Sequence, residues 1–368
     1  MPATGIGHQL FCDGGRLPRT NLAAWTASVR AQLDRGGDGP GEGALSGAGN
    51  VAALLCVHYG RPDVASALCH AQLDWTTELV RRSPSGVRLA IAPWINLGRL
   101  ASRRGDVDEA LGHFRLGEDT ELVSLGPLTV SHGDWLRALD EPPEMRAAVD
   151  RAQLLERMKA LLRGGRYHAA IEAAEGSVAA DTADARDETR LIALVGLRRH
   201  REALEAMSAP RGGSDSFAET ARLVQTWPST VELRGVAAGR RSALAVGSRL
   251  QMAPAGTEDG PGQWTTLALA IARILERAQE PTAAADAYER ALSWARVTHD
   301  EPDLAMALDG TVRTAAQPER LAELRELLAG CEYASVRNAH GLAPPRWTGT
   351  AIERLTTSLL GAFGASVR

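Results

Sequence analysis

One stretch decides how this chain folds: Trp94-Ile95-Asn96-Leu97-Gly98, followed by Gly105-Asp106-Val107-Asp108-Glu109-Ala110-Leu111 and then by Phe114. Apolar residues recur at helical spacing in each part, and Gly105-Asp106 interrupts the pattern between them. Small Gly98 and Ala110 would let two helix backbones approach, while the larger apolar residues fill the space on either side. The stretch therefore predicts two short helices packed as a hairpin.

The same arrangement recurs along the chain when other alanines are placed at the position of Ala110. The four further anchors are Ala65, Ala170, Ala203 and Ala284. Successive anchors are 45, 60, 33 and 81 residues apart, so the array is irregular. The excess length between 117 and 150 predicts an inserted loop, and the longest interval leaves room for a degenerate helix pair built from residues 217–227 and 229–250.

This pattern resembles the tetratricopeptide repeat, a helical hairpin of about 34 residues. The likeness extends over about residues 46–335, and residues 165–173 closely resemble the opening of the family's second helix. It implies an all-α fold, a right-handed superhelical solenoid of antiparallel helix pairs, here irregular. An ordinary helical protein rich in Ala and Leu also produces such matches by chance, and that alternative stays open.

The repeat pattern and the loop signals divide the chain into six segments. They are an N-terminal helix with a Gly-rich loop (1–45), two repeats with the insert (46–140), two further repeats (141–210), the degenerate pair (211–260), the last full repeat with following helices (261–335) and a C-terminal loop with a capping helix (336–368). Thr350 and Glu353 have capping-box spacing at the start of that last helix. We expect it to close the last repeat.

Composition narrows the classes of function. The formal net charge is -4, and no basic run is interleaved with aromatic residues, so nucleic acid is disfavoured as a partner. No apolar run is long enough to span a membrane, and the four scattered cysteines suit reduced, packed thiols, so we expect a cytoplasmic protein without membrane contact. Lys159 is the single lysine beside 40 arginines, which suggests the codon usage of a bacterial, for example actinobacterial, genome.

If the repeats are tetratricopeptide-like, the resemblance implies that residues eleven and seven positions before each anchor line a concave groove. Three repeats place a basic pair there, and the pairs are Arg99 and Arg103, Lys159 and Arg163, and Arg273 and Arg277. Like charges at this spacing destabilise an isolated helix, and an acidic peptide, a carboxylate or a phosphate would relieve the repulsion. A merely solvated face explains the same residues, and Glu276 could neutralise the last pair.

Polar residues of the two earliest repeats extend the same predicted surface. They are Asn50, His58 and Asn96. Together they resemble part of the carboxylate clamp of some tetratricopeptide domains, although the clamp's set of Lys and Asn residues does not recur in order. We therefore do not carry over its peptide specificity.

Signals for catalysis are isolated. His132, in Ser131-His132-Gly133-Asp134-Trp135, is the one catalytic candidate, but adjacent Ser and His cannot face one another as nucleophile and base. His70 and Asp74 share a helix face without a third metal ligand, and neither Cys12 nor His340 has a paired base. No phosphate loop or dinucleotide motif occurs, so we expect neither a cofactor nor a metal.

Three hypotheses remain. The preferred one is a noncatalytic scaffold that binds a protein or peptide segment, with acidic character, in the basic groove. The second is an accessory protein or enzyme of bacterial specialised metabolism, with a pocket formed by the solenoid and the 117–150 insert. The third is a sensor of a small anionic ligand. A homodimer through the exposed ends of the array remains an open alternative.

Overall fold

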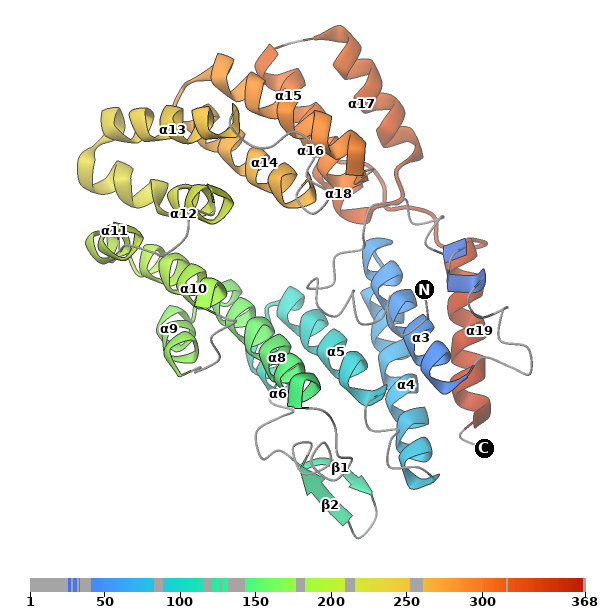
Figure 1. The fold of residues 1–368 in the computed structure, drawn as a ribbon. Coiled ribbons are helices and arrows are strands. Elements are labelled where there is room, and N and C mark those ends of the chain that lie inside the picture. Colours follow the sequence, from blue (N-terminus) through green and yellow to red (C-terminus); the bar gives the residue numbers. More distant parts are fainter. Residues whose placement is uncertain are drawn as a thin grey trace. The chain divides into compact units, whose positions relative to one another are not determined.

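The computed structural model describes residues 26–27, 29–31, 33, 41–82, 89–114, 121–125, 128–131, 143–176, 183–208, 216–251, 261–298, 300–315 and 317–366. Within these ranges the chain is predominantly helical, and neighbouring helices pack in pairs (Figure 1), as the repeat pattern predicts. The chain forms two compact units. Unit 1 comprises residues 1–17, 22–173 and 344–368, and unit 2 comprises residues 18–21 and 174–343.

Each unit is built from consecutive helices. Unit 1 contains α3 (Glu42–His58), α4 (Pro62–Arg82), α5 (Ile91–Arg104), α6 (Val107–Phe114), α8 (Pro143–Arg163), the start of α9 (Tyr167–Glu175) and α19 (Ala351–Ser366). Unit 2 contains α10 (Ala183–Gly196), α11 (His200–Ser208), α12 (Ser216–Arg234), α13 (Val236–Gln251), α14 (Pro261–Arg277), α15 (Pro281–Thr298), α16 (Glu301–Ala315), α17 (Pro318–Gly330) and α18 (Ala334–Ala339). No described helix combines the length and apolarity needed to cross a bilayer.

The hairpin predicted between residues 94 and 114 is formed by α5 and α6. Ala110 and Phe114 are buried, and a Cβ atom at Gly98 would lie 2.4 Å from a ring carbon of Phe114. Only a glycine therefore admits this ring without a shift of the packing. Trp94 is half-buried, with its ring 5.1 Å from that of His113, so it covers the edge of the hairpin and does not fill its centre.

Five hairpins share one turn geometry. The anchor alanines 65, 110, 170, 203 and 284 are all fully buried. Five positions before each anchor, the backbone has a left-handed φ, at Gly60 (82°), Gly105 (84°), Gly165 (68°), Arg198 (58°) and Gln279 (59°). The next N–H group donates to the carbonyl five residues earlier at 2.7–3.0 Å, which satisfies a carbonyl at the end of the first helix. One structural unit thus recurs along the chain.

The helix pair expected in the longest interval is also present, with a different turn. α12 continues through Pro228, and the turn falls at Gly235, whose φ is 80°, instead of at Pro228 as predicted. Gly239 then lets α13 approach α12, because a Cβ atom there would lie 2.4 Å from a methyl carbon of Val231. The indole of Trp227 donates to the Gly239 carbonyl at 2.9 Å. A Pro in the sequence therefore did not mark the helix end, because packing against α13 stabilises the helix around it.

The expected insert contains regular structure. Strands β1 (Glu121–Leu125) and β2 (Leu128–Ser131) pair antiparallel, with an irregularity between Glu121 and Val123, and α8 begins at Pro143. The described chain is helical as predicted, and this short strand pair lies within the segment that was expected to be an inserted loop. The sequence signal lay in two short apolar stretches on either side of Gly126-Pro127, which is a turn pattern.

The C-terminal helix α19 packs against α3 and α4 of the first repeat (Figure 1). Phe363 is fully buried, with its ring 5.4 Å from that of Trp75, and Thr356 lies 3.5 Å from the Cys56 thiol. The predicted capping residues are in place, since Thr350 Oγ1 accepts from the Glu353 N–H at 3.1 Å. The expectation that this helix closes the last repeat was wrong, because the apolar surface that it covers belongs to the first.

Candidate functional site

Three helices of unit 1 carry the polar side chains predicted for the early groove. α5 packs against both α3 and α8, so these helices form one continuous face (Figure 1). The face carries Asn50 and His58 from α3, Asn96, Arg99 and Arg103 from α5, and Lys159 and Arg163 from α8. The four cationic residues, Arg99, Arg103, Lys159 and Arg163, are called the basic cluster below.

A buried carboxylate that the sequence analysis missed holds part of this cluster. The Glu156 side chain is 7% exposed, and its Oε1 accepts from Arg99 Nη2 at 3.1 Å and from Lys159 Nζ at 3.2 Å. Burial by itself raises the pKa of Glu156, but the attraction and hydrogen bonds of Arg99 and Lys159 outweigh it, so the pKa lies below the usual value. Glu156 is therefore charged at neutral pH and ties α8 to α5.

Two amide side chains continue the polar network toward α3. Asn96 Nδ2 donates to Asn50 Oδ1 at 3.3 Å, and Arg99 Nη1 lies 3.4 Å from Asn96 Oδ1. These are long hydrogen bonds, so the side chains hold one another only loosely. The arrangement joins Asn50, Asn96, Arg99 and Glu156 in one chain of contacts across three helices.

Arg103 and Arg163 are exposed, and neither forms an ion pair with Glu156, although the Glu156 charge still attracts Arg103. Arg163 Nη1 lies 3.4 Å from Ser102 Oγ, and no described residue forms an ion pair or hydrogen bond with the Arg103 side chain. Surrounding protein desolvates Arg103, and Arg163 and Arg99 repel it, so its pKa lies below the ordinary value. Counting the basic cluster and Glu156 among the described residues, four cations against one carboxylate give the face a local net charge of +3, in a chain whose formal charge is -4.

His58 is neutral at physiological pH. Burial, and then repulsion by Arg103, lower the pKa of its imidazole to about 4. It therefore adds a neutral ring to the face and leaves the local charge unchanged.

A small cavity opens between α3 and α5 beside the cluster. Its volume is about 20 Å³, and its walls include Asn96, Arg99 and Arg103 together with apolar residues such as Val57 and Leu100. The Nε–H group of Arg99 is buried and has no acceptor among the described residues. A space of this size holds a single oxygen atom or water molecule, which would satisfy that donor.

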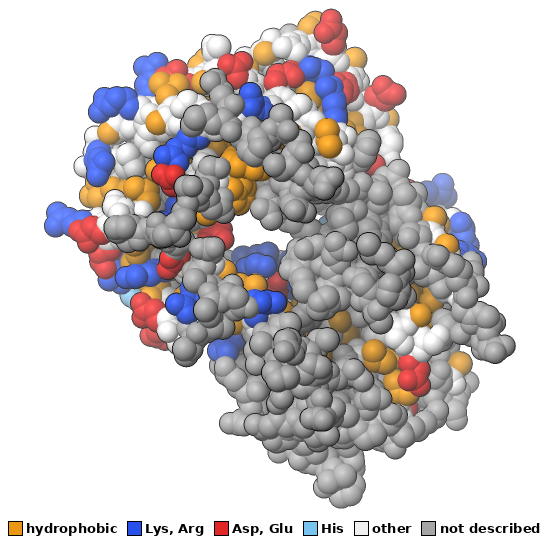
Figure 2. Space-filling view, viewed as in Figure 1, with side chains coloured by type: hydrophobic (Ala, Val, Ile, Leu, Met, Phe, Trp, Pro, Cys, Tyr) orange, Lys and Arg blue, Asp and Glu red, His pale blue; other side chains and the backbone are white. Residues whose placement is uncertain are grey.

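The basic pair of the last repeat lies in unit 2. Arg273 and Arg277 are exposed on α14, and Arg273 Nη2 contacts Met306 Sδ at 3.2 Å. Glu276 does not neutralise them. It accepts from the Tyr288 hydroxyl at 2.7 Å and pairs with Arg313 at 3.3 Å. Lys and Arg side chains are interspersed with Asp and Glu side chains over the coloured part of the surface in Figure 2.

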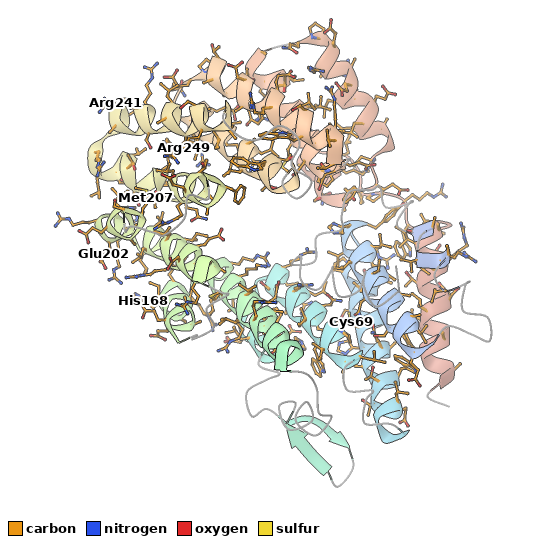
Figure 3. The ribbon with its side chains drawn as sticks, in the orientation of Figure 1. Cys69, His168, Glu202, Met207, Arg241 and Arg249 are labelled. Carbon is orange, nitrogen blue, oxygen red and sulfur yellow. The ribbon has the colours of Figure 1, made fainter. Side chains whose placement is uncertain are left out.

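The residues considered for catalysis contribute little to any described site. His132 and Cys12 lie outside the described residues. The described part of the chain contains no group of three or more metal-ligating side chains, so His70 and Asp74 have no third ligand there. Cys56 and Cys69, the latter on α4 in Figure 3, are buried, and burial raises the pKa of their thiols to about 11 and about 12.

A wider groove in unit 2 was not anticipated. It lies between α13 and α15, has a volume of about 910 Å³ and is lined by Leu244, Asp286, Arg290 and Trp294 among others. Arg290 donates to the Leu250 carbonyl at 2.7 Å, and its guanidinium carbon lies 6.0 Å from the Trp294 ring centre. The guanidinium group therefore already has partners within the protein.

Comparisons with known proteins leave the family open. No protein-family model matches the chain, and no curated protein matches it. A solved structure described as "Crystal structure of BtubC (BKLC) from P. vanneervenii" is similar over 78% of this chain and 95% of that chain, with 14% sequence identity and a TM-score of 0.33. Similarity this distant carries no argument about fold or function.

Proposed function

We propose that unit 1 is a noncatalytic interaction module that binds an acidic segment of a partner protein on the face formed by α3, α5 and α8. The observation that carries this proposal is that Arg103 and Arg163, beside the buried Arg99–Glu156 pair, form no ion pair with any described residue. Two arginine forks on neighbouring helices suit bidentate recognition of carboxylate groups. The half-buried Asn50 on the same face offers its amide N–H group to the backbone of a bound segment.

The shape of the face favours a partner segment over a free small molecule. Sites for small molecules commonly enclose about 300–1,000 Å³. The cavity at the basic cluster is about 20 Å³, enough for one ligand atom. The remainder of any ligand would lie along the surface, as an extended segment does. The small cavity therefore favours an interaction module over a sensor that encloses an anion at this cluster.

We also propose that the five hairpins are tetratricopeptide-like repeats and that the array winds as a right-handed solenoid. The shared turn and the buried anchor alanines support this proposal. An experimental structure tests it, since left-handed or absent superhelical winding would contradict it. The proposed role suits a cytoplasmic protein.

Fluorescence anisotropy with labelled peptides tests the binding function. One peptide alternates Glu and Gly over about ten residues, and a control alternates Gln and Gly. We expect the full-length protein to bind the Glu peptide. The affinity should fall as salt rises from about 50 to about 300 mM, because dissolved ions screen the attraction between exposed arginines and exposed glutamates. The Gln peptide should bind far more weakly.

Two charge-removing variants and one control locate the site. Arg103→Gln and Arg163→Gln should each weaken binding about tenfold or more, because each removes a guanidinium that pairs with no carboxylate among the described residues. Arg241→Gln, on α13 (Figure 3), removes an exposed arginine from unit 2 and should leave affinity unchanged. Equal binding of the Glu and Gln peptides, or equal losses in all three variants, would refute the proposed function.

A further inference from the structure

Three features of the face meet at one place on α5. The Arg99 Nε–H is buried without an acceptor among the described residues, and Arg99 and Arg103 both line the small cavity. Arg163 reaches this part of α5 from α8, with its Nη1 atom 3.4 Å from Ser102 Oγ. An incoming oxygen atom in the cavity would lie against Arg99, which has the unsatisfied donor, and against Arg103, while Arg163 on α8 is close enough to repel Arg103.

We infer that this notch binds the phosphoryl group of a phosphorylated residue in the partner segment, with one oxygen in the cavity and the others between Arg103 and Arg163. The inference rests on the proposed function and names the group that the same face selects. Arg99, Arg103 and Arg163 each act as donors, and none of them needs to leave a carboxylate, because the Glu156 bond to Arg99 uses a different nitrogen, Nη2.

Charge is the first reason to prefer a phosphoryl group to a single carboxylate. The face carries a net charge of +3, and His58 adds none. A carboxylate supplies one negative charge, whereas a phosphorylated serine supplies about 1.5 to 2 at neutral pH. The dianion therefore offsets more of the repulsion among the arginines.

Donor geometry is the second reason. A planar carboxylate has two oxygens, which one arginine fork can satisfy. A phosphoryl group has three terminal oxygens, arranged so that donors can approach from different directions. Here the donors come from two helices, since Arg99 and Arg103 lie on α5 and Arg163 lies on α8, which suits a group that accepts from more than one direction. The small cavity volume matches one of its oxygens.

Three labelled peptides test the inference. They share the acidic background used above and differ at one central position, which is phosphoserine, glutamate or serine. We expect the full-length protein to bind the phosphoserine peptide about tenfold tighter than the glutamate peptide. Arg163→Lys keeps the charge and loses the fork, so it should reduce the preference for phosphoserine more than it weakens binding of the glutamate peptide. Arg241→Gln should change neither affinity, and circular dichroism checks that each variant is folded.

The possible outcomes separate the inference from the function on which it rests. Equal affinity for the phosphoserine and glutamate peptides refutes the phosphoryl site and leaves acidic-segment binding intact. Absence of binding by all three peptides refutes both. Inorganic phosphate is a further probe, added as a competitor. If it displaces the glutamate peptide while the phosphoserine peptide binds no tighter than the glutamate one, the site takes free phosphate, and the assignment to a phosphorylated residue of the partner segment is wrong.

Discussion

Replacing Glu156 with Gln should lower stability and raise affinity for acidic peptides at the same time. The side chain is 7% exposed and its partner Arg99 is 11% exposed, so this charge-assisted hydrogen bond contributes about 1.5–3 kcal/mol. The bond to Lys159, which is 45% exposed, adds less than about 1 kcal/mol because water screens it. A glutamine oxygen still accepts from Arg99 and returns about 1 kcal/mol, so the net loss should be about 2 kcal/mol.

Affinity should move in the opposite direction, because the substitution raises the net charge of the face from +3 to +4. Urea unfolding followed by circular dichroism measures the stability, and anisotropy with the Glu peptide measures the affinity. The chain has two compact units, so the unfolding curves are fitted without assuming one transition. Glu172→Gln on α9 is the matched control, since Glu172 is exposed and no described residue pairs with it.

The stability that Glu156 contributes should also depend on pH. The pKa of Glu156 is lower in the folded protein than the ordinary value of about 4.3. Its stabilisation is therefore fully present above that ordinary value and is lost as the pH falls through the lower folded pKa. The stability difference between the parent protein and Glu156→Gln should shrink on acidification. A difference below about 0.5 kcal/mol at neutral pH, or weaker peptide binding by the variant, would refute the reasoning.

Three further predictions concern the scaffold. Phe363→Ala should cost about 3–5 kcal/mol in urea unfolding, because the ring is fully buried against the first repeat, and a loss below about 1 kcal/mol would contradict the docking of α19. Gly98→Ala should cost about 1–3 kcal/mol, since its Cβ would meet the Phe114 ring, and adding Phe114→Leu should recover part of that loss in the same assay. Cys69 should react with a thiol reagent near pH 8 only after denaturation, because it is buried and its pKa is raised to about 12; rapid reaction of this thiol in the native protein, identified by mass spectrometry, would argue against its position.

The parts of the fold that depend on local spacing could be predicted from the sequence. An anchor alanine and the residues around it lie within one hairpin, so helical periodicity alone places Ala110 at the helix contact, where it is fully buried. The turn was visible where glycine occupies the left-handed position, as at Gly105. It was hidden at Arg198 and Gln279, because the packing of the two helices imposes the same φ on residues that do not prefer it.

Contacts between distant segments could not be predicted in this way. The apolar stripe of α19 shows that the helix must be covered, but a stripe does not say which surface covers it. Glu156 was missed for a related reason. An acid three residues before Lys159 is equally common on an exposed helix, and only the approach of α5 and α8 turns it into a buried carboxylate. Arg99 and Arg103 could be predicted because their spacing places them on one helix face. The sequence did not show that Arg99 pairs with a buried carboxylate and that Arg103 does not.

The Glu156 bonds also bear on the proposed binding role of the basic cluster. Four cations on two packed helices repel one another, and after desolvation this repulsion is the second cause of the lowered pKa of Arg103. A second carboxylate near Arg103 would remove the repulsion and stabilise the fold. The chain instead places one buried acid where it fixes Arg99 and Lys159, and leaves Arg103 and Arg163 exposed. Unfavourable charge that a single substitution could relieve is expected where a ligand supplies the missing negative charge, since stability is then exchanged for binding.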